Sequence, residues 1–186
     1  GPFHTPLSDY SITAFSMMDT RGTACSIGEQ PIKGLLNIDS MVEMTIGEML
    51  TNLVFVGITD FRDIKCLGNW MWSPKLKNNG QLLYNAVLRV ENILKTLKIG
   101  IDGGKDSLSM NTKINDKIVM SPNTLVMSSY VLCPDIRVKA TPDFKKAGSI
   151  ILFVDLSYYN YNLGGSQFAQ NLGQLGSQPP RFRNIK

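Results

Sequence analysis

The chain has 186 residues, which suffices for one domain, or for one domain with part of a second. Hydrophobic residues make up 43%, enough for a core, whereas charged residues make up 18%, less than the roughly 25% typical of soluble domains. The net charge of +4 is small and the basic residues are scattered, which argues against a nucleic-acid-binding arm. The low charged fraction predicts that another domain or subunit covers part of the surface.

Three widely spaced cysteines, Cys25, Cys66 and Cys133, include no C-x-x-C pair. An odd number with this spacing argues against a disulfide framework and a zinc site, so we expect reduced thiols. The sequence has no charged-then-apolar leader and no run of eighteen apolar residues, so we expect a cytoplasmic protein without a membrane span. The chain begins at Gly1 without Met and stops at Lys186, and we expect both ends to be cuts through a longer polypeptide.

The first third of the chain predicts a strand, a loop and a helix. Residues 10–15 alternate polar and apolar side chains, as a half-buried strand does. Residues 20–34 contain three glycines and a proline, which favours a loop. Ser40 and Glu43 have the spacing of a capping box, and the apolar residues after them keep a helical period up to Val54.

The middle of the chain predicts a second helix and a hairpin. Residues 55–59 fit either a buried strand or the last turn of the preceding helix. Residues 81–98 have apolar side chains on one helical face, and Gly100 is expected to end that helix. Residues 112–114 and 117–120 predict two strands of a hairpin joined at Asn115 and Asp116.

The last third predicts further strands at 124–132, 136–140 and 150–156, and a short helix at 166–175. This order predicts an α+β fold, in which helices cover one face of a mixed sheet. Residues 141–148 are polar and include a proline, so we place a domain boundary there. The predicted units are residues 1–146 and 147–186.

A glycine-rich stretch from Asp102 to Ser107 is the first candidate site. Gly103 and Gly104 allow backbone amides to approach an anion closely, while Lys105 adds a charge and Ser107 a hydroxyl. The stretch lacks the P-loop pattern, so it fits a phosphate cradle and a plain tight turn about equally well.

Glu48 and Asn52 form the second candidate site. Their i,i+4 spacing places both side-chain oxygens on one helical face, and such oxygens suit Mg²⁺. An ordinary solvated helix face explains the pair as well. Ser8 and Asp9 follow a proline-containing turn, so Asp9 is either a further metal ligand or the acceptor of a turn hydrogen bond.

Asp60 and Asp63 either bind metal or pair with a neighbouring base such as Arg62. Trp70 and Trp72 fit the wall of a base pocket, although core packing is the commoner role. His4 is the only histidine and has no expected catalytic partner, which argues against nucleophilic hydrolysis.

These motifs resemble the large, single-chain form of phosphoribosylformylglycinamidine (FGAM) synthase. They occur in the order of that family across almost the whole chain, which makes the resemblance specific. The matching stretches are 28–31 (GEQP), 50–55 (LTNLVF), 59–60 (TD), 62–63 (RD), Cys66 with 68–72 (GNWMW), 102–110 (DGGKDSLSM), 133–135 (CPD) and 163–165 (LGG).

The resemblance implies an aminoimidazole-ribonucleotide-synthetase-like N-terminal subdomain from the second synthase half, followed by the truncated start of the C-terminal subdomain. The family is a ligase of purine biosynthesis. It converts formylglycinamide ribonucleotide, ATP and glutamine into the amidine, ADP, phosphate and glutamate, with Mg²⁺ and an amide phosphorylated by ATP. The first synthase half and the glutaminase domain are missing here, so we expect the chain to be inactive alone.

The resemblance also implies residue roles. Asp9, Glu48 and Asn52 match Mg²⁺ ligands around a bound, structural nucleotide. At Lys105 the related short form has a metal-binding asparagine, so Lys105 does not simply inherit that role. The implied nucleotide-binding residues are Ser8, Asp60, Gly103, Gly104 and Lys105, the implied substrate-binding residue is Ser107, and no catalytic residue is identified.

Two alternatives remain open at this point. One is another ATP-using member of the same superfamily, such as a relative of selenophosphate synthetase or thiamine-phosphate kinase. The other is a non-catalytic structural or interaction module that keeps the fold. The latter predicts no Mg²⁺-dependent nucleotide binding.

Overall fold

The computed structural model describes residues 8–157 and 161–182. The predicted proline-containing turn falls partly outside them, as does His4. Within the described ranges, no helix is long and apolar enough to cross a membrane.

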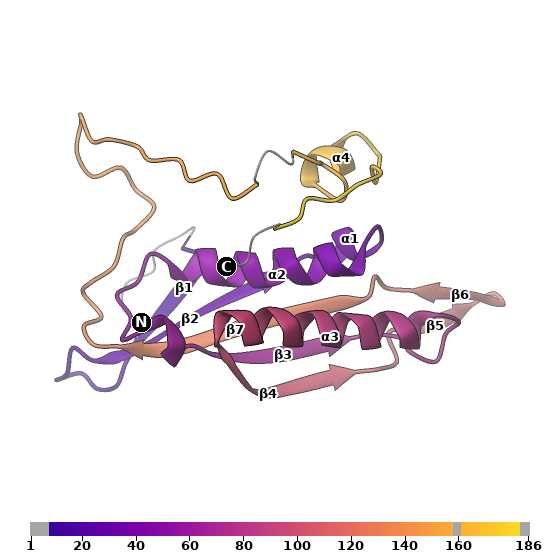
Figure 1. Ribbon diagram of the computed structural model, residues 1–186, viewed down its shortest axis with the longest axis horizontal. Coiled ribbons are helices and arrows are strands. Elements are labelled where there is room, and N and C mark those ends of the chain that lie inside the picture. The colour runs from indigo at the N-terminus through magenta and orange to yellow at the C-terminus, as the bar shows by residue number, and fades with distance from the viewer. Residues whose placement is uncertain (1–7, 158–160, 183–186) are drawn as a thin grey trace.

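A five-stranded mixed sheet forms the centre of the structure (Figure 1). From edge to edge its strands are β1 (Tyr10–Ala14), β2 (Gly22–Glu29), β7 (Thr124–Cys133), β3 (Lys65–Met71) and β4 (Gly100–Ser107). Neighbours are antiparallel except β3 and β4, which are parallel and joined by a helical crossover. The predicted α+β class is confirmed.

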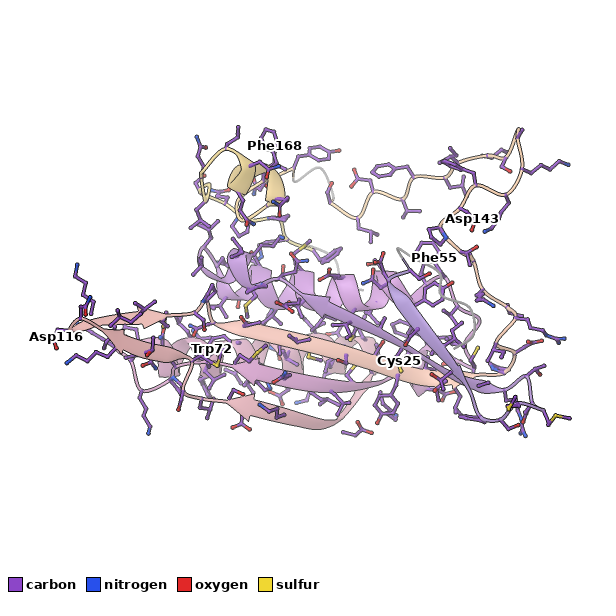
Figure 2. All side chains as sticks on the ribbon, turned by 180° about the vertical axis from the view of Figure 1, so that it is seen from behind. Cys25, Phe55, Trp72, Asp116, Asp143 and Phe168 are labelled. Atoms are coloured by element: carbon purple, nitrogen blue, oxygen red, sulfur yellow. The ribbon has the colours of Figure 1, made fainter. Side chains whose placement is uncertain are left out.

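Two helices, α2 (Ile38–Leu53) and α3 (Asn79–Leu97), cover one face of this sheet (Figure 1). Buried and less buried residues alternate along β2 and β7, as expected for strands that have helices on one face only. The other face carries exposed apolar side chains such as Ile27, Leu67 and Leu132. Figure 2, seen from behind, shows the sheet in front of the helices.

The core lies between the helices and the covered face. Trp72, Met41 and Ile46 are its largest fully buried members, and each such side chain contributes roughly 1.5–3 kcal/mol on burial. The Trp72 indole N–H donates to the carbonyl of Asn79 at 3.1 Å, so the ring is buried without an unpaired donor. Core packing is therefore the role of Trp72.

The start of α2 differs from the prediction. The N-cap is Asn37, whose side chain accepts a hydrogen bond from the Ser40 N–H at 2.9 Å. Ser40 and Glu43 lie within α2 and are buried against the protein interior, where Glu43 accepts hydrogen bonds from Arg89 and Arg181. The predicted capping box is wrong because both of its members face the protein interior.

The end of α3 also differs. Lys98 takes the left-handed conformation, with φ of 58°, and caps the helix, whereas Gly100 already begins β4. The predicted hairpin is confirmed as β5 (Asn111–Ile114) and β6 (Lys117–Met120). Asn115 and Asp116 both have positive φ, as a two-residue type I′ turn requires. Figure 2 shows Asp116 at its tip.

Two predicted loops are strands. Residues 20–34 contain β2 and the short helix α1 (Pro31–Gly34), and residues 102–107 belong to β4. Their strand glycines serve close packing. A Cβ at Gly28 would lie 2.0 Å from the carbonyl oxygen of Thr45 in α2, so only glycine lets β2 approach the helix this closely.

Several other predicted elements are shorter or absent. Residues 55–59 form neither a strand nor a helical turn, and residues 136–140 contribute only a single bridge between Val56 and Lys139. Residues 150–156 form no strand, and their apolar side chains are exposed. The remaining short helices are η1 (Phe61–Asp63) and α4 (Gln167–Asn171), the second of which falls within the predicted 166–175.

The C-terminal part of the chain returns to the helical layer. Residues 141–157 run away from the body, with Asp143 on that excursion, before the segment with α4 lies above α1 (Figures 1 and 2). Arg181 then pairs with Glu43, and a Cβ on Gly47 of α2 would overlap the ring of Phe182. The predicted division at residue 146 stays a prediction.

Candidate functional site

Glu48 and Asn52 lie on successive turns of α2 and both reach the backbone of β2. The Glu48 Oε2 accepts a hydrogen bond from the Glu29 N–H at 2.7 Å. The Asn52 Nδ2 donates to the carbonyl of Ile27 at 3.0 Å. The end of β2 thus holds both side chains in fixed orientations.

Close contact between α2 and β2 makes these bonds possible. At Gly28 the two backbones are too close for a Cβ, which would also lie 2.6 Å from the Met49 nitrogen. Two residues before Gly28 in β2, the Ser26 hydroxyl donates to the carbonyl of Met49 at 2.6 Å. Because hydrogen bonds flank the glycine on both sides, helix and strand form one rigid support for the site.

The orientation leaves one oxygen of each side chain available. The described residues supply no hydrogen bond to the Glu48 Oε1 or the Asn52 Oδ1. A carboxylate and an amide oxygen one helical turn apart fit the oxygen preference of Mg²⁺. Within the described ranges, no group of three or more His, Cys, Asp or Glu side chains is placed to hold a metal ion.

Ser8 and Asp9 lie just before β1, beside the same end of β2. Tyr10 pairs with Ser26, so the residue before Tyr10 lies next to Ile27, whose carbonyl binds Asn52. Asp9 is exposed and Ser8 half-buried. The backbone of Asp9 therefore lies beside the end of β2 that binds Glu48 and Asn52.

Two residues that the sequence analysis did not single out complete the site at this end of β2. The Gln30 Nε2 donates to the Glu48 Oε2 at 2.9 Å, and the Lys33 ammonium donates to the Gln30 Oε1. Burial lowers the pKa of Lys33, while the charge of Glu48 acts in the opposite direction. The motif at 28–31 was the available signal, since it places Gln30 directly after β2.

The predicted phosphate cradle lies on the opposite edge of the sheet. Glu29, Val126, Asn69 and Lys105 form one row across β2, β7, β3 and β4. Three strand spacings separate the ends of this row by roughly 14 Å. Since Gly28 faces α2, the side chains of this row point to the other face of the sheet, so one metal ion cannot contact both sets.

The glycines of β4 are extended and serve sheet packing. Neither Gly103 nor Gly104 has positive φ, and a Cβ at Gly104 would lie 2.6 Å from the carbonyl oxygen of Gly68. A Cβ at Gly103 would meet the Leu67 side chain at 2.5 Å. The Lys105 ammonium donates to the Ser107 hydroxyl. The stretch is a polar strand edge, without the curled backbone that cradles phosphate.

Asp60 lies at the far end of the sheet. The neighbouring Thr59 N–H donates to the carbonyl of Leu132, six residues or roughly 20 Å along β7 from the row that contains Glu29. The Asp60 carboxylate caps η1 and pairs with Arg62 at 3.0 Å. These hydrogen bonds hold the pKa of Asp60 below its usual value.

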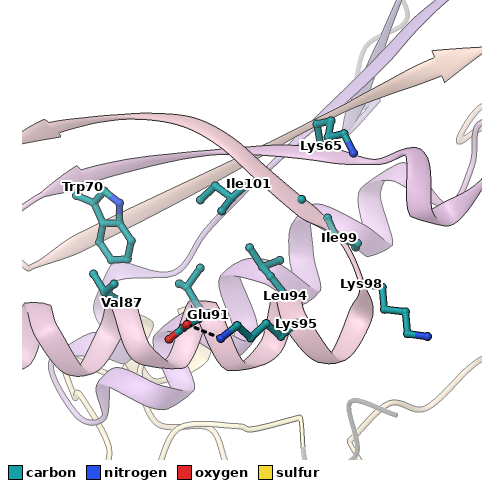
Figure 3. A pocket seen from close by; sticks show the side chains of 11 residues that line it. Lys65, Trp70, Val87, Glu91, Leu94, Lys95, Lys98, Ile99 and Ile101 are labelled. Carbon is teal, nitrogen blue, oxygen red and sulfur yellow. Dashed lines mark hydrogen bonds and ion pairs between the residues drawn. The ribbon is translucent and has the colours of Figure 1, made fainter.

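An open hollow of about 670 Å³ lies between α3 and the β3–β4 edge (Figure 3). Trp70, Leu94 and Ile101 supply apolar lining, and Glu91 and Lys95 form an ion pair of 2.6 Å at its rim. Trp70, one of the two predicted walls of a base pocket, lines this hollow, whereas none of the predicted metal, nucleotide and substrate residues does.

Comparison with known proteins identifies the family. A model of the FGAR-AT PurM_N-like domain matches residues 1–132, which is more than two thirds of the chain. The chain belongs to this family. The resemblance to FGAM synthases is thereby confirmed.

Named relatives of this FGAR-AT PurM_N-like chain agree with the family match. The phosphoribosylformylglycinamidine synthase of Dictyostelium discoideum is 45% identical over 188 residues, covering 97% of this chain and 14% of the relative. The human enzyme of the same name is 43% identical over 182 residues, with 97% and 14% covered. The chain thus spans about one seventh of the relatives it matches.

The fold of the FGAR-AT PurM_N-like chain is similar to that of a solved bacterial protein. Thermotoga maritima PurL complexed with ATP superposes with a TM-score of 0.57 at 16% identity, covering 74% of this chain and 22% of that chain. At this identity the similarity establishes the fold alone. The expected aminoimidazole-ribonucleotide-synthetase-like architecture is confirmed.

Proposed function

We propose that the chain is the part of an FGAM synthase that binds a nucleotide through Mg²⁺. The observation that carries the proposal is the pair Glu48 and Asn52, whose free oxygens are held one turn apart by the backbone of β2. The family and the relatives' names support the reaction class, an ATP-dependent ligase of purine biosynthesis.

Asp9, Glu48 and Asn52 would hold the metal, and Ser8 would contact the nucleotide. When bound, Mg²⁺ neutralises phosphate charge and orients the phosphates. The protein's own contribution is rigidity, because ligands fixed before binding lose little conformational freedom on binding. The bound species is ATP or ADP.

The polar edge of β4 would belong to a second, separate contact. Gly103, Gly104 and Lys105 would contact nucleotide there, and Ser107 the formylglycinamide ribonucleotide. The distance of roughly 14 Å across the sheet supports two subsites over one. Asp60 is the least supported nucleotide contact, since its carboxylate is already paired with Arg62.

The partners of the proposed function are the other synthase half and a glutaminase domain that supplies ammonia from glutamine. The coverage of about one seventh of each relative supports this, because most of the enzyme lies outside the chain. The three unpaired cysteines favour a cytoplasmic location. We infer no nucleic-acid or membrane partner.

A chimera tests the function. This chain replaces the corresponding segment of the Dictyostelium relative, and glutamine- and ATP-dependent amidine formation is measured. We expect an active chimera, and an at least tenfold loss with Glu48→Ala or Asn52→Ala. Glu91→Ala removes a comparable helical glutamate from α3 and serves as the control. A folded but inactive chimera would argue against the proposed function.

Calorimetry of the chain with Mg²⁺ and ADP tests the binding step directly. If Glu48→Ala and Asn52→Ala bind both as the parent does, the metal assignment is wrong. If the parent binds neither, the chain is a non-catalytic module that keeps the fold.

A further inference from the structure

The Glu48 carboxylate receives two hydrogen bonds on the same oxygen. The Glu29 N–H and the Gln30 side-chain amide both donate to Oε2, at 2.7 and 2.9 Å. Two donors on one oxygen fix the rotation of the carboxylate. The other oxygen is thereby presented on the side away from β2.

The Gln30 amide has its own means of orientation. A glutamine amide can turn by half a rotation and present its oxygen in place of its nitrogen. In that flipped state, Gln30 would set its carbonyl against the Glu48 carboxylate, which repels it. The Lys33 ammonium is a donor only, so its bond to the Gln30 Oε1 selects the orientation that donates to Glu48.

The C-terminal segment of the chain packs against Lys33. Lys33 lies in α1, and its backbone packs against Gly165 of the C-terminal segment. A Cβ at Gly165 would lie 3.0 Å from the Lys33 Cα, and Gly165 has φ of 68°, so glycine is required there. The half-buried lysine is thus packed between the C-terminal segment and the site.

We propose that Gln30 and Lys33 are positioning residues for the metal site, acting in series through Glu48. Lys33 orients the Gln30 amide, the amide fixes the Glu48 Oε2, and Oε1 is left aimed at the cation. The proposal rests on the proposed function, because it assigns a purpose to the free oxygen of Glu48.

The experiment measures Mg²⁺ binding by calorimetry on the whole chain, with Mg²⁺ alone and with Mg²⁺ plus ADP. Gln30→Ala and Lys33→Met should weaken Mg²⁺ binding about ten- to hundredfold, the range for residues that orient a ligand. Lys33→Arg keeps a donor and should bind within about threefold of the parent, by the same reasoning. Lys75→Met removes an exposed lysine elsewhere and should have no effect.

A double-variant series separates positioning from general stabilisation. In the Glu48→Ala background, Lys33→Met should weaken Mg²⁺ binding no further, because it acts only through Glu48. A purely structural role would lower the melting temperature of the metal-free chain and leave the Mg²⁺ affinity of the folded chain unchanged. That result would overturn the proposal.

The outcomes distinguish this proposal from the function on which it rests. If Gln30→Ala and Lys33→Met bind Mg²⁺ like the parent while Glu48→Ala does not, the positioning role is refuted and the metal site stands. If Glu48→Ala and Asn52→Ala also bind like the parent, the metal site itself is refuted. If Lys33→Met weakens Mg²⁺ binding further in the Glu48→Ala background, the proposal that Lys33 acts through Glu48 is refuted.

Discussion

Replacing Gly28 with alanine should separate α2 from β2 and disable the candidate site in the same step. The new Cβ would lie 2.0 Å from the Thr45 oxygen, whereas ordinary contact begins at 3.4 Å, so the two backbones must part by about 1.4 Å. The atoms nearest to the new Cβ, the Thr45 oxygen and the Met49 nitrogen, belong to the backbone of α2 in a close-packed core, which deforms little. The helix must therefore move as a unit.

The same displacement determines how much stability the Gly28→Ala variant loses. A shift of about 1.4 Å would stretch the bonds of Glu48, Asn52 and Ser26, now 2.7, 3.0 and 2.6 Å, beyond hydrogen-bonding distance. At about 1 kcal/mol each, the three losses amount to roughly 3 kcal/mol before any strain in the core. For a chain of this size, the melting temperature should fall by roughly 6–12 °C.

The assay is thermal and urea unfolding followed by tryptophan fluorescence, since Trp72 belongs to the core and Trp70 packs against it. Mg²⁺ binding is measured on the same samples below the transition. Gly100→Ala is the matched control, because its nearest neighbour is the flexible side chain of Lys65 at 3.3 Å, and its cost should stay below about 1 kcal/mol. A melting temperature of Gly28→Ala within about 2 °C of the parent would refute the reasoning.

Three further predictions concern the core, the thiols and the hairpin. Glu43→Ala leaves two arginines without their buried partner, so urea unfolding should show a loss of about 3–5 kcal/mol; a loss below about 1 kcal/mol would contradict this. Burial raises the pKa of Cys66 to about 11, so at pH 8 its thiolate fraction is roughly a hundredfold below that of an ordinary thiol. A thiol reagent should therefore modify the half-buried Cys25 first, as peptide mapping would reveal, and earlier modification of Cys66 would contradict its burial. Asp116→Val places a branched side chain at φ of 63°, which should weaken the hairpin by about 1–2 kcal/mol and speed amide exchange in residues 111–120; unchanged exchange would count against the type I′ turn.

The role of glycine separates what the sequence predicts from what it does not. The type I′ turn at Asn115 and Asp116 was predictable because turn chemistry is local. The glycines of β2 and β4 were misinterpreted as loop markers. At Gly28 and Gly104 the reason for glycine is a backbone distant in sequence, Thr45 in one case and Gly68 in the other. Spacing along the chain carries no signal of such a contact.

The same distinction applies to the candidate site. The i,i+4 spacing of Glu48 and Asn52 predicted a shared face of α2, and the structure has both on it. Their attachment to β2 depends on a strand that the sequence did not predict. The capping box failed for a related reason, since Ser40 and Glu43 fit the local pattern but point into the core. Tertiary burial overrode the local preference.

The position of β7 in the sheet has a consequence for synthesis on the ribosome. β7 is the last of the five strands to be made, yet it lies between β2 and β3, which do not pair with each other. Until residues 124–133 emerge, the β1–β2 pair and the β3–α3–β4 unit each keep an unpaired inner edge. At translation rates of roughly 5–20 residues per second, the β2 edge waits roughly 5–20 s for its partner. During that interval the nascent chain offers two strand edges to chaperones and to neighbouring nascent chains.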